Sequence, residues 1–267
     1  MYFLLIIPVL FLFYLFCLKG RTGHPKLAEL RKWNYAHRGL HNERLPENSL
    51  GAFRNAVAHG FGAELDVHLM KDGHLAVIHD SNLSRVAGAD VNIEDLTVSD
   101  LDNYRLLGTE EKIPLFSQVL QVFDGKTPLI VELKSFQNNC APLCEAVCKM
   151  LDGYQGLYCL ESFDPRCIIW LRKHRPDLVR GQLSENWFAG KSTLPWFVKL
   201  VMTFHLSNLL TRPDFIAYKY QHRKTAGTNL CRRLWKVQGV SWTIPTRQDF
   251  DTAVSEGWIP IFENFIP

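Results

Sequence analysis

Residues 63–80 read AELDVHLMKDGHLAVIHD, and the interpretation of the whole chain starts from this stretch. Its first half alternates apolar residues with polar ones, among them Glu64 and Asp66, which is the period-two pattern of a β-strand. The two carboxylates therefore share one face of the strand. Repulsion between them raises the pKa of at least one of the two unless a cation lies between them. A turn at 71–73 leads into a second short strand that ends at His79. The stretch thus predicts a metal site with a proton-transfer group beside it.

The composition is that of a globular protein. The chain has 267 residues, of which 47% are hydrophobic and 21% charged, and this length suits one α/β barrel of roughly 250 residues. The formal net charge is +3, and no long basic run is interleaved with aromatic residues, so nucleic-acid binding is not expected. The seven cysteines show neither a CxxC pair nor zinc-site spacing, and Cys140, Cys144 and Cys148 recur at helical intervals. This pattern favours free thiols in a reducing compartment.

The N-terminal segment predicts a membrane anchor. Residues 2–18 carry no charge and are almost wholly apolar, near the short end of the roughly 17–25 residues that cross a bilayer. No basic residue precedes the segment and no small-residue cleavage site follows it, so we interpret 1–20 as a retained single-pass anchor rather than a signal peptide. A basic linker at 21–32 follows, and the positive-inside rule places the main domain, 33–267, on the cytoplasmic side.

Strand and helix patterns alternate along that main domain. Predicted strands include 33–36, 63–69, 128–134, 158–161, 178–183, 214–217, 240–244 and 258–262. Alternation of this kind indicates a parallel sheet, and eight or so units favour a closed TIM (β/α)₈ barrel over an open doubly wound sheet. No glycine-rich nucleotide loop follows the first strand. The unusually apolar segment 194–210 is interpreted as a helix or lid packed on the core, with an interfacial membrane helix as the alternative.

Chemically active residues gather at the predicted carboxyl ends of the early strands, where a barrel builds its active face. They are His37, Arg38, Glu64, Asp66, His79, Glu132 and Lys134. Carboxylate oxygens suit Ca²⁺ or Mg²⁺ better than zinc, and a guanidinium with a lysine suits phosphate. Two histidines suit a proton relay, so the set predicts a phosphodiesterase. On spacing alone, a solvated Glu-x-Asp face and a Glu-x-Lys ion pair stay open as structural alternatives.

A series of short motifs then resembles, in order, the glycerophosphodiester phosphodiesterase (GDPD) family. The motifs lie at 37–39 (HRG), 46–49 (PENS), 64–67 (ELDV), 71–73 (KDG), 79–80 (HD), 113–114 (IP), 131–134 (VELK), 162–164 (SFD) and 241–243 (SWT). The resemblance runs from about residue 33 to the C-terminus. It implies a TIM barrel of the type seen in phospholipase-C-like (PLC-like) phosphodiesterases.

The resemblance also implies roles for individual residues. Glu64, Asp66 and Glu132 match the ligands of one divalent cation, which is Ca²⁺ or Mg²⁺ with Mn²⁺ as a third option. His37 and His79 match the general acid/base pair, Arg38 a phosphate contact and Lys134 a substrate or metal-shell contact. Trp242 is expected to wall the substrate mouth, with ordinary barrel packing as the alternative. Glu47 is expected either to support the metal site from behind its ligands or to favour a helix N-terminus by its charge.

Two positions depart from the family pattern, Met70 and the run 262–264 (FEN). Neither is expected to touch the catalytic set, and the second is expected to alter the bottom of the substrate pocket. The implied reaction is metal-dependent cleavage of glycerophosphodiesters to glycerol 3-phosphate and an alcohol. Two alternatives stay open: a lysophospholipase D or sphingomyelinase D-like enzyme acting on membrane lysolipids, and a non-catalytic barrel that binds phospholipid head groups. The expected partners are this substrate and the membrane.

Overall fold

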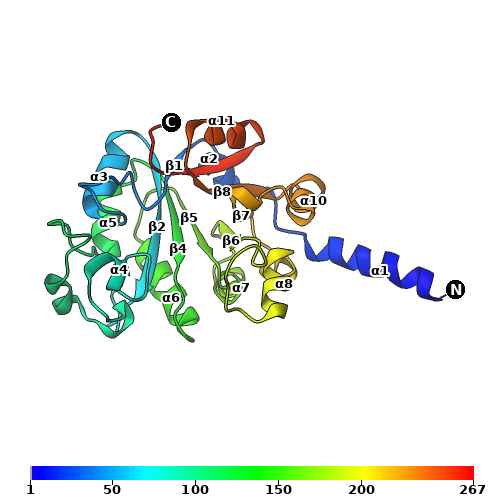
Figure 1. Ribbon diagram of the computed structural model, residues 1–267, viewed down its shortest axis with the longest axis horizontal. Coiled ribbons are helices and arrows are strands. Elements are labelled where there is room, and N and C mark those ends of the chain that lie inside the picture. Colours follow the sequence, from blue (N-terminus) through cyan, green and yellow to red (C-terminus); the bar gives the residue numbers. More distant parts are fainter. Residues whose placement is uncertain (1) are drawn as a thin grey trace.

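The computed structural model describes residues 2–267. Within that range, eight parallel strands close into a barrel with helices around it, and a ninth strand, β3, pairs antiparallel with β2 (Figure 1). The barrel closes because β1 pairs with both β2 and β9. The strands are β1 Tyr35–Ala36, β2 Gly62–Leu69, β3 Leu75–Val77, β4 Leu129–Leu133, β5 Tyr158–Ser162, β6 Arg180–Ser184, β7 Phe215–Lys219, β8 Gln238–Ile244 and β9 Trp258–Phe262. This confirms the predicted (β/α)₈ barrel.

Helices connect the strands and cover the outside of the barrel. The α-helices are α1 Tyr2–Cys17, α2 Pro25–Leu30, α3 Leu50–Ala58, α4 Ser84–Ala87, α5 Phe116–Phe123, α6 Cys140–Leu151, α7 Pro165–His174, α8 Trp196–Thr203, α9 Asn208–Thr211, α10 Ala226–Leu234 and α11 Arg247–Ser255. Three short 3-10 helices lie at η1 Ile93–Asp95, η2 Val98–Asn103 and η3 Tyr220–His222. Local sequence sets several helix starts. Ser49 caps α3 by accepting a hydrogen bond from the Ala52 amide, and Asp164 caps α7 just before Pro165.

Side-chain alternation along the strands separates two cores. In β4, Val131 packs outward against the helices, whereas Ile130 packs inside the barrel. Helix α2 closes the end of the barrel where the strands begin, with Leu27 and Leu30 packed on the interior cluster. Residue 132 has the same parity as residue 130, so Glu132 also faces the interior, one layer nearer the carboxyl ends of the strands. The interior is therefore apolar at one end and acidic at the other.

The hairpin formed by β2 and β3 brings the motif at 79–80 back beside the acidic strand. Val67 pairs with Val77 in antiparallel register, and the Ile78 amide donates to the Asp66 carbonyl oxygen at 3.1 Å. The excursion that follows β3 has a hydrophobic cluster of its own, which includes Ile78 and Leu101. This satellite core fixes the end of β3, and His79 follows it directly.

Helix α1 extends away from the barrel (Figure 1). It has 16 residues, and Leu18, directly after it, is buried against Ile216 and Val237. No helix in the described part of the chain is long and apolar enough to cross a membrane. The prediction of a transmembrane helix within 1–20 is therefore not supported, because the apolar run is divided between an exposed helix and a buried residue at its end.

The apolar segment at 194–210 does not form one helix packed on the core. It contains α8, a turn and the start of α9, and in α8 only Met202 and Thr203 are buried. Trp196 and Phe197 are 71% and 56% exposed. The prediction of one core-packed helix is thus wrong, because a turn divides the segment and the start of α8 is exposed, whereas Met202, His205 and Asn208 are buried.

Candidate active site

Three buried carboxylates meet in the acidic layer of the barrel. Glu64 and Asp66 lie on β2 and Glu132 lies on β4, and Asp66 is the direct register partner of Glu132. A ligand atom from each lies within 4.8 Å of the other two, and the three residues are 3%, 1% and 6% exposed. We call these three residues the acidic cluster. The strand parity read from the sequence is what places them together.

Two basic side chains and an amide contact the acidic cluster. Lys134 Nζ lies 3.1 Å from Asp66 Oδ1 and 2.9 Å from Glu132 Oε1. Arg38 Nε lies 3.5 Å from Asp66 Oδ2, and the Arg38 backbone amide donates to Glu64 Oε2 at 3.1 Å. Asn48 donates from Nδ2 to Asp66 Oδ2 at 2.8 Å. Arg38 and Asn48 both have positive φ, 52° and 56°, and such strain concentrates where a backbone must present groups to a site.

These contacts separate the three carboxyl groups electrostatically. Burial would raise the pKa of Asp66, but Lys134, His79, Arg38 and the Asn48 hydrogen bond outweigh it and hold the pKa below its usual range. Burial raises the pKa of Glu132 to about 7 against the opposing effect of Lys134. Burial, then Asp66 and Glu132, raise the pKa of Glu64 well above its ordinary value. The raised pKa values of Glu64 and Glu132 reflect the cost of ionising all three groups, which would leave more negative charge than Lys134 and Arg38 neutralise.

That excess fits a hard divalent cation. Glu161, the register partner of Glu132 on β5, adds a fourth carboxyl group that is 1% exposed. Its Oε2 has no hydrogen-bond partner among the described residues. Burial, then Glu132 and Asp66, raise the pKa of Glu161 well above its usual value. Oxygen-only donors in this number suit Ca²⁺, Mg²⁺ or Mn²⁺, and a cation bound there would polarise a phosphoryl oxygen and offset developing negative charge.

His37 lies beside the acidic cluster and is oriented by a carboxylate. Its Nε2 is 3.9 Å from Glu64 Oε2, and its Nδ1 is 2.7 Å from Glu263 Oε1. His41 Nε2 contacts the same Glu263 oxygen at 3.2 Å. Hydrogen bonds from His37 and then His41 hold the pKa of Glu263 below its ordinary range, so the carboxylate is ionised and accepts from His37 Nδ1–H. This leaves His37 Nε2 free to take or give a proton.

His79 is oriented by a carboxylate in the same way. Its Nδ1 is 2.7 Å from Asp80 Oδ1. Burial lowers the pKa of His79 to about 4, against the raising effect of Asp66. Arg85 joins Asp80 to Glu47, and Glu47 Oε1 accepts from Arg38 Nη1 at 2.8 Å. A continuous chain of charged contacts therefore runs from His79 to Arg38, and Glu47 contacts the basic neighbours of the site.

Several residues of the site were missed or misjudged at the sequence level. The run at 262–264 was expected not to touch the catalytic set, and this is wrong, because Glu263 contacts His37 directly. His41, Arg85 and Glu161 were not singled out. For Glu161 and Glu263 a signal existed, since both lie at the carboxyl end of a predicted strand and so obey the rule that selected Glu132.

Substitution of Glu263 by glutamine is expected to lower kcat by about 10- to 100-fold, because an amide orients His37 less firmly than a carboxylate. Burial lowers the pKa of His37 and the Glu263 hydrogen bond partly offsets this, so the substitution lowers that pKa further. The limb of the pH–rate profile that belongs to His37 should move to lower pH. Glu43→Gln, on an exposed neighbouring loop, is the matched control. An unchanged profile with full kcat in Glu263→Gln would exclude the positioning role.

Trp242, on β8, belongs to an aromatic wall rather than to the acidic layer. Its ring packs edge-to-face on Phe163 at 5.5 Å, and Phe163 packs on Trp187 at 5.7 Å. Lys219 Nζ lies 5.9 Å from the Trp242 ring centre. Phe163 and Trp187 also line a cavity of about 760 Å³, which we call the apolar groove. Glu132 and Lys134 lie on its wall as well, and α8 contributes Phe197, Val198, Val201 and Met202. An apolar space therefore opens directly from the candidate site.

Comparison with known proteins places this geometry in a family. The sequence model of the "Glycerophosphoryl diester phosphodiesterase family" matches residues 37–213. A glycerophosphodiester phosphodiesterase of Caldanaerobacter subterraneus is 38% identical over 235 residues, which cover 83% of this chain and 89% of that protein. Lysophospholipase D GDPD1 of Rattus norvegicus is 36% identical over 134 residues, 43% of this chain and 42% of that protein. The alignment thus spans less than half of the lysophospholipase D relative.

A solved structure supports the same fold. A phosphodiesterase of Oleispira antarctica, in complex with the product sn-glycerol-3-phosphate, superposes with a TM-score of 0.70 at 19% identity, covering 91% of this chain and 95% of that one. At such identity the likeness concerns the barrel alone. The family match and the Caldanaerobacter relative, however, both extend over most of the chain, and the family match at 37–213 spans both histidines and the acidic cluster. The chain therefore belongs to the glycerophosphoryl diester phosphodiesterase family.

Proposed function

We propose that the protein hydrolyses glycerophosphodiesters, with one divalent cation, to glycerol 3-phosphate and an alcohol. The observation that carries the proposal is the pair of carboxylate-oriented imidazoles, His37 with Glu263 and His79 with Asp80, next to one acidic cluster, where His37 lies near Glu64 and His79 senses the charge of Asp66. Arg38 and Lys134 supply positive charge for the phosphate. One imidazole removes a proton from the attacking oxygen as that oxygen bonds to phosphorus, and the other gives a proton to the leaving alcohol oxygen as the P–O bond breaks. The attacking oxygen belongs either to water, which gives glycerol 3-phosphate directly, or to the substrate's own glycerol hydroxyl group, in which case water then opens the cyclic phosphate. Glu64, Asp66 and Glu132 hold the cation.

A product assay tests this function. Purified protein is incubated with glycerophosphocholine in the presence of Mg²⁺, Ca²⁺ or Mn²⁺, and glycerol 3-phosphate and choline are both measured. We expect equal amounts of the two products, and no turnover after treatment with EDTA. Release of phosphocholine instead of choline would mean cleavage on the other side of the phosphorus, and hydrolysis that survives EDTA would contradict the role of the cation. Absence of turnover with every cation would contradict the proposal and would leave the lysophospholipase D alternative and the head-group binding barrel.

The apolar groove supports a second candidate substrate class, the lysophospholipids. Its wall joins the phosphate-facing residues Glu132 and Lys134 to the apolar side chains of α8, so a head group and a single acyl chain can occupy one continuous space. Three of the similar proteins are lysophospholipases D, which agrees with this reading. Hydrolysis at the same P–O bond would then give lysophosphatidic acid and the head-group alcohol.

Substitution of Phe197 by aspartate separates the two substrate classes. Loss of an aromatic contact with the acyl chain removes about 1.5–3 kcal/mol of binding, so kcat/KM for lysophosphatidylcholine should fall roughly 10- to 100-fold. Turnover of glycerophosphocholine, which has no acyl chain, should stay unchanged. Phe188→Asp is the control, because Phe188 is 53% exposed and lies outside the groove. An equal decrease for both substrates would argue against the groove as an acyl site.

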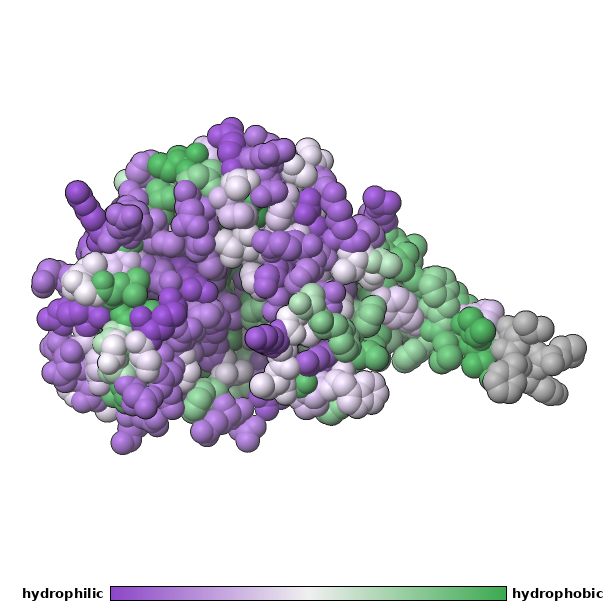
Figure 2. All heavy atoms as spheres, viewed as in Figure 1, coloured by the Kyte–Doolittle hydropathy of each residue, from purple (hydrophilic) through white to green (hydrophobic). Residues whose placement is uncertain are grey.

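We further propose that α1 attaches the protein to a membrane, with the barrel on the cytoplasmic side. Figure 2 shows hydrophobic residues along α1, where Ile7 and Leu10 are 71% and 61% exposed. Lys19 lies over the Trp235 ring at 5.5 Å near the base of the helix, a pairing of basic and aromatic residues that suits a membrane interface. The positive charges that follow the helix support the cytoplasmic side.

Substitution of Ile7 and Leu10 by lysine is expected to abolish flotation of the full chain with phosphatidylcholine vesicles, since two charges oppose insertion. Ser255→Cys provides a thiol for the topology, because the seven native cysteines are all buried and label poorly on either side. A membrane-impermeant maleimide should label this exposed position only after the cells are opened. Flotation of the lysine variant, or labelling in intact cells, would refute the corresponding half of the proposal.

A further inference from the structure

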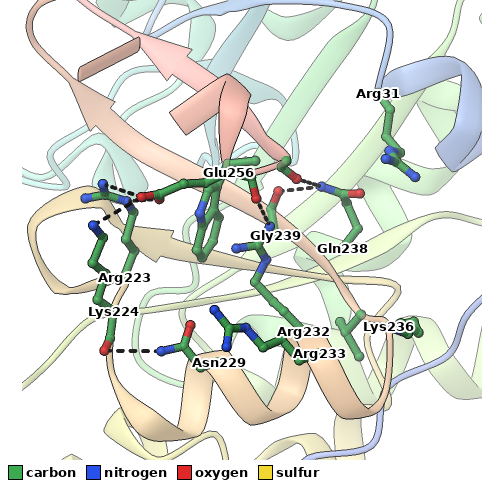
Figure 3. Close-up of a pocket in the computed structure, with 13 residues that line it drawn as sticks. Arg31, Arg223, Lys224, Asn229, Arg232, Arg233, Lys236, Gln238, Gly239 and Glu256 are labelled. Carbon is green, nitrogen blue, oxygen red and sulfur yellow. Dashed lines mark hydrogen bonds and ion pairs between the residues drawn. The ribbon is translucent and has the colours of Figure 1, made fainter. Parts of the chain in front are cut away.

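A second cavity lies away from the candidate active site, between α10, α11 and the end of α2 (Figure 3). Its volume is about 640 Å³, and it is lined by Gly239 of β8 and Trp258 of β9. Both residues lie near the start of their strands, whereas Glu132 and Lys134 lie at strand carboxyl ends. We call this cavity the basic pocket. None of the residues of the candidate site lines it.

Positive charge dominates the lining. The pocket has six basic residues, Arg31, Arg223, Lys224, Arg232, Arg233 and Lys236, and one carboxylate, Glu256. That carboxylate is already engaged, since Arg223 Nε lies 2.8 Å and Lys224 Nζ lies 3.2 Å from its oxygens. Among residues 2–267, Arg31, Arg233 and Lys236 form no ion pair, although all three are exposed. Those three of the six positively charged side chains that line the pocket therefore have no carboxylate partner among the described residues.

Arg232 shows the electrostatic consequence. Its guanidinium lies 3.8 Å from the Trp258 ring centre and donates to the Glu256 carbonyl oxygen at 2.9 Å, so it is fixed at the pocket wall. Burial, with added repulsion from Arg233 and Arg223, lowers its pKa although Glu256 opposes the effect. The neighbouring positive charges therefore disfavour the charged form of Arg232, and an anion in the pocket would remove that cost.

We propose that the basic pocket binds the phosphate group of a phosphate-bearing anion. Arginine forks and lysine ammonium groups are the side chains that bind phosphate best, and three of them have no other ionic partner among the described residues. The volume lies within the roughly 300–1,000 Å³ of small-molecule sites, so the pocket has room for an organic phosphate. The phosphate belongs either to a soluble phosphoester or to an anionic lipid. The second source is within reach because Leu230 and Cys231 of α10 belong to the same hydrophobic cluster as Tyr14 and Leu15 of α1.

Glycine amides give a local readout of binding. The full chain, labelled with ¹⁵N-glycine in dodecyl maltoside micelles, is titrated with inorganic pyrophosphate. We expect saturable shifts of Gly239 and Gly257, which line the pocket, and these are distinct from shifts of Gly39 beside Arg38 in the candidate active site. Arg233→Ala with Lys236→Ala should weaken binding at Gly239 and Gly257 by about tenfold or more, since two charge-assisted contacts are lost.

The control is Lys149→Ala with Lys173→Ala, two exposed lysines on α6 and α7 outside the pocket. It removes the same amount of charge and should leave the affinity unchanged. Absence of saturable shifts at Gly239 and Gly257 would overturn the proposal. Equal weakening of binding by the control pair would also overturn it, because the effect would then come from the net charge of the protein alone.

Vesicle binding then distinguishes the two sources of phosphate, once the pyrophosphate titration has established the site. The two variants and the wild type are floated with phosphatidylcholine vesicles that contain or lack 20% phosphatidylglycerol. Selective loss of binding to the anionic vesicles in Arg233→Ala/Lys236→Ala supports a lipid head group as the natural occupant. Unchanged partition supports a soluble phosphoester. Because basal hydrolysis of glycerophosphocholine does not involve this pocket, it should stay intact in both variants whatever the outcome.

Discussion

Replacing His37 with alanine is expected to lower kcat on glycerophosphocholine by about 10²- to 10⁴-fold, and His79→Ala should do the same. Each imidazole has its Nδ1 engaged by a carboxylate, Glu263 or Asp80, which leaves Nε2 for proton transfer, and both histidines lie close enough to the acidic cluster to contact Glu64 or sense Asp66. Alanine removes the only group at that position that can move a proton. Because the two histidines act in one reaction, the double variant should lose little more activity than either single variant.

The measurement is steady-state kinetics of the three variants, with thermal unfolding as a check on folding. His74→Ala is the matched control, because the His74 side chain is 57% exposed on the turn between β2 and β3. It should retain wild-type kcat. If His37→Ala or His79→Ala keeps wild-type turnover while folded, that residue is not part of the acid/base pair.

Removal of the cation is expected to have an effect of similar size. Chelation with EDTA should reduce turnover to background, and Asp66→Asn should lower kcat/KM by about 10²-fold or more, because one ligand loses its charge. Asparagine keeps the shape of the side chain and still accepts from Lys134, so the barrel should fold. Asp95→Asn, at an exposed position, is the control. Activity that is unaffected by EDTA and by Asp66→Asn would contradict a cation-dependent reaction.

The same cluster predicts how stability depends on pH. Burial raises the pKa of Glu132 from 4.5 to about 7, so ionisation of this group disfavours the cation-free folded state. The protonated Glu132 carboxyl group makes its full contribution to the free energy of unfolding below pH 4.5. That contribution is lost as the pH rises through about 7, at a cost of roughly 3 kcal/mol. A bound cation removes that cost. Addition of Mg²⁺ or Ca²⁺ should therefore raise Tm by several degrees at pH 8 and by much less at pH 5, as calorimetry can measure.

Period-two alternation explains why much of the barrel could be predicted. It puts Glu64 and Asp66 on the inner face of one strand, and the strand-end rule then adds Glu132 and Lys134. These inferences use only spacing within a strand and the parallel order of neighbouring strands. They therefore hold for any chain in which such strands close into a barrel.

Contacts that depend on how the first and last strands of the barrel pair were not predictable in the same way. Glu263 reaches His37 because Ala36 pairs with Phe262, a register that joins the first strand to the last. A closed barrel implies that the first strand pairs with the last, but nothing local in the sequence reports the register of that pairing. The same holds for Arg85, which connects Asp80 to Glu47 from the excursion after β3. For α8, an apolar composition predicted burial, but the barrel had no further surface to cover it.

The most direct test of the central claim is the position of a bound cation. A crystal of the wild-type protein soaked with Mn²⁺ should show one anomalous peak among the oxygens of Glu64, Asp66 and Glu132, with His37 and His79 on either side. The structure offers a second group of donors for comparison, His37, His41 and Glu263, whose ligand atoms also lie within 4.8 Å of one another. A peak at that second group, or none at the acidic cluster, would contradict the account.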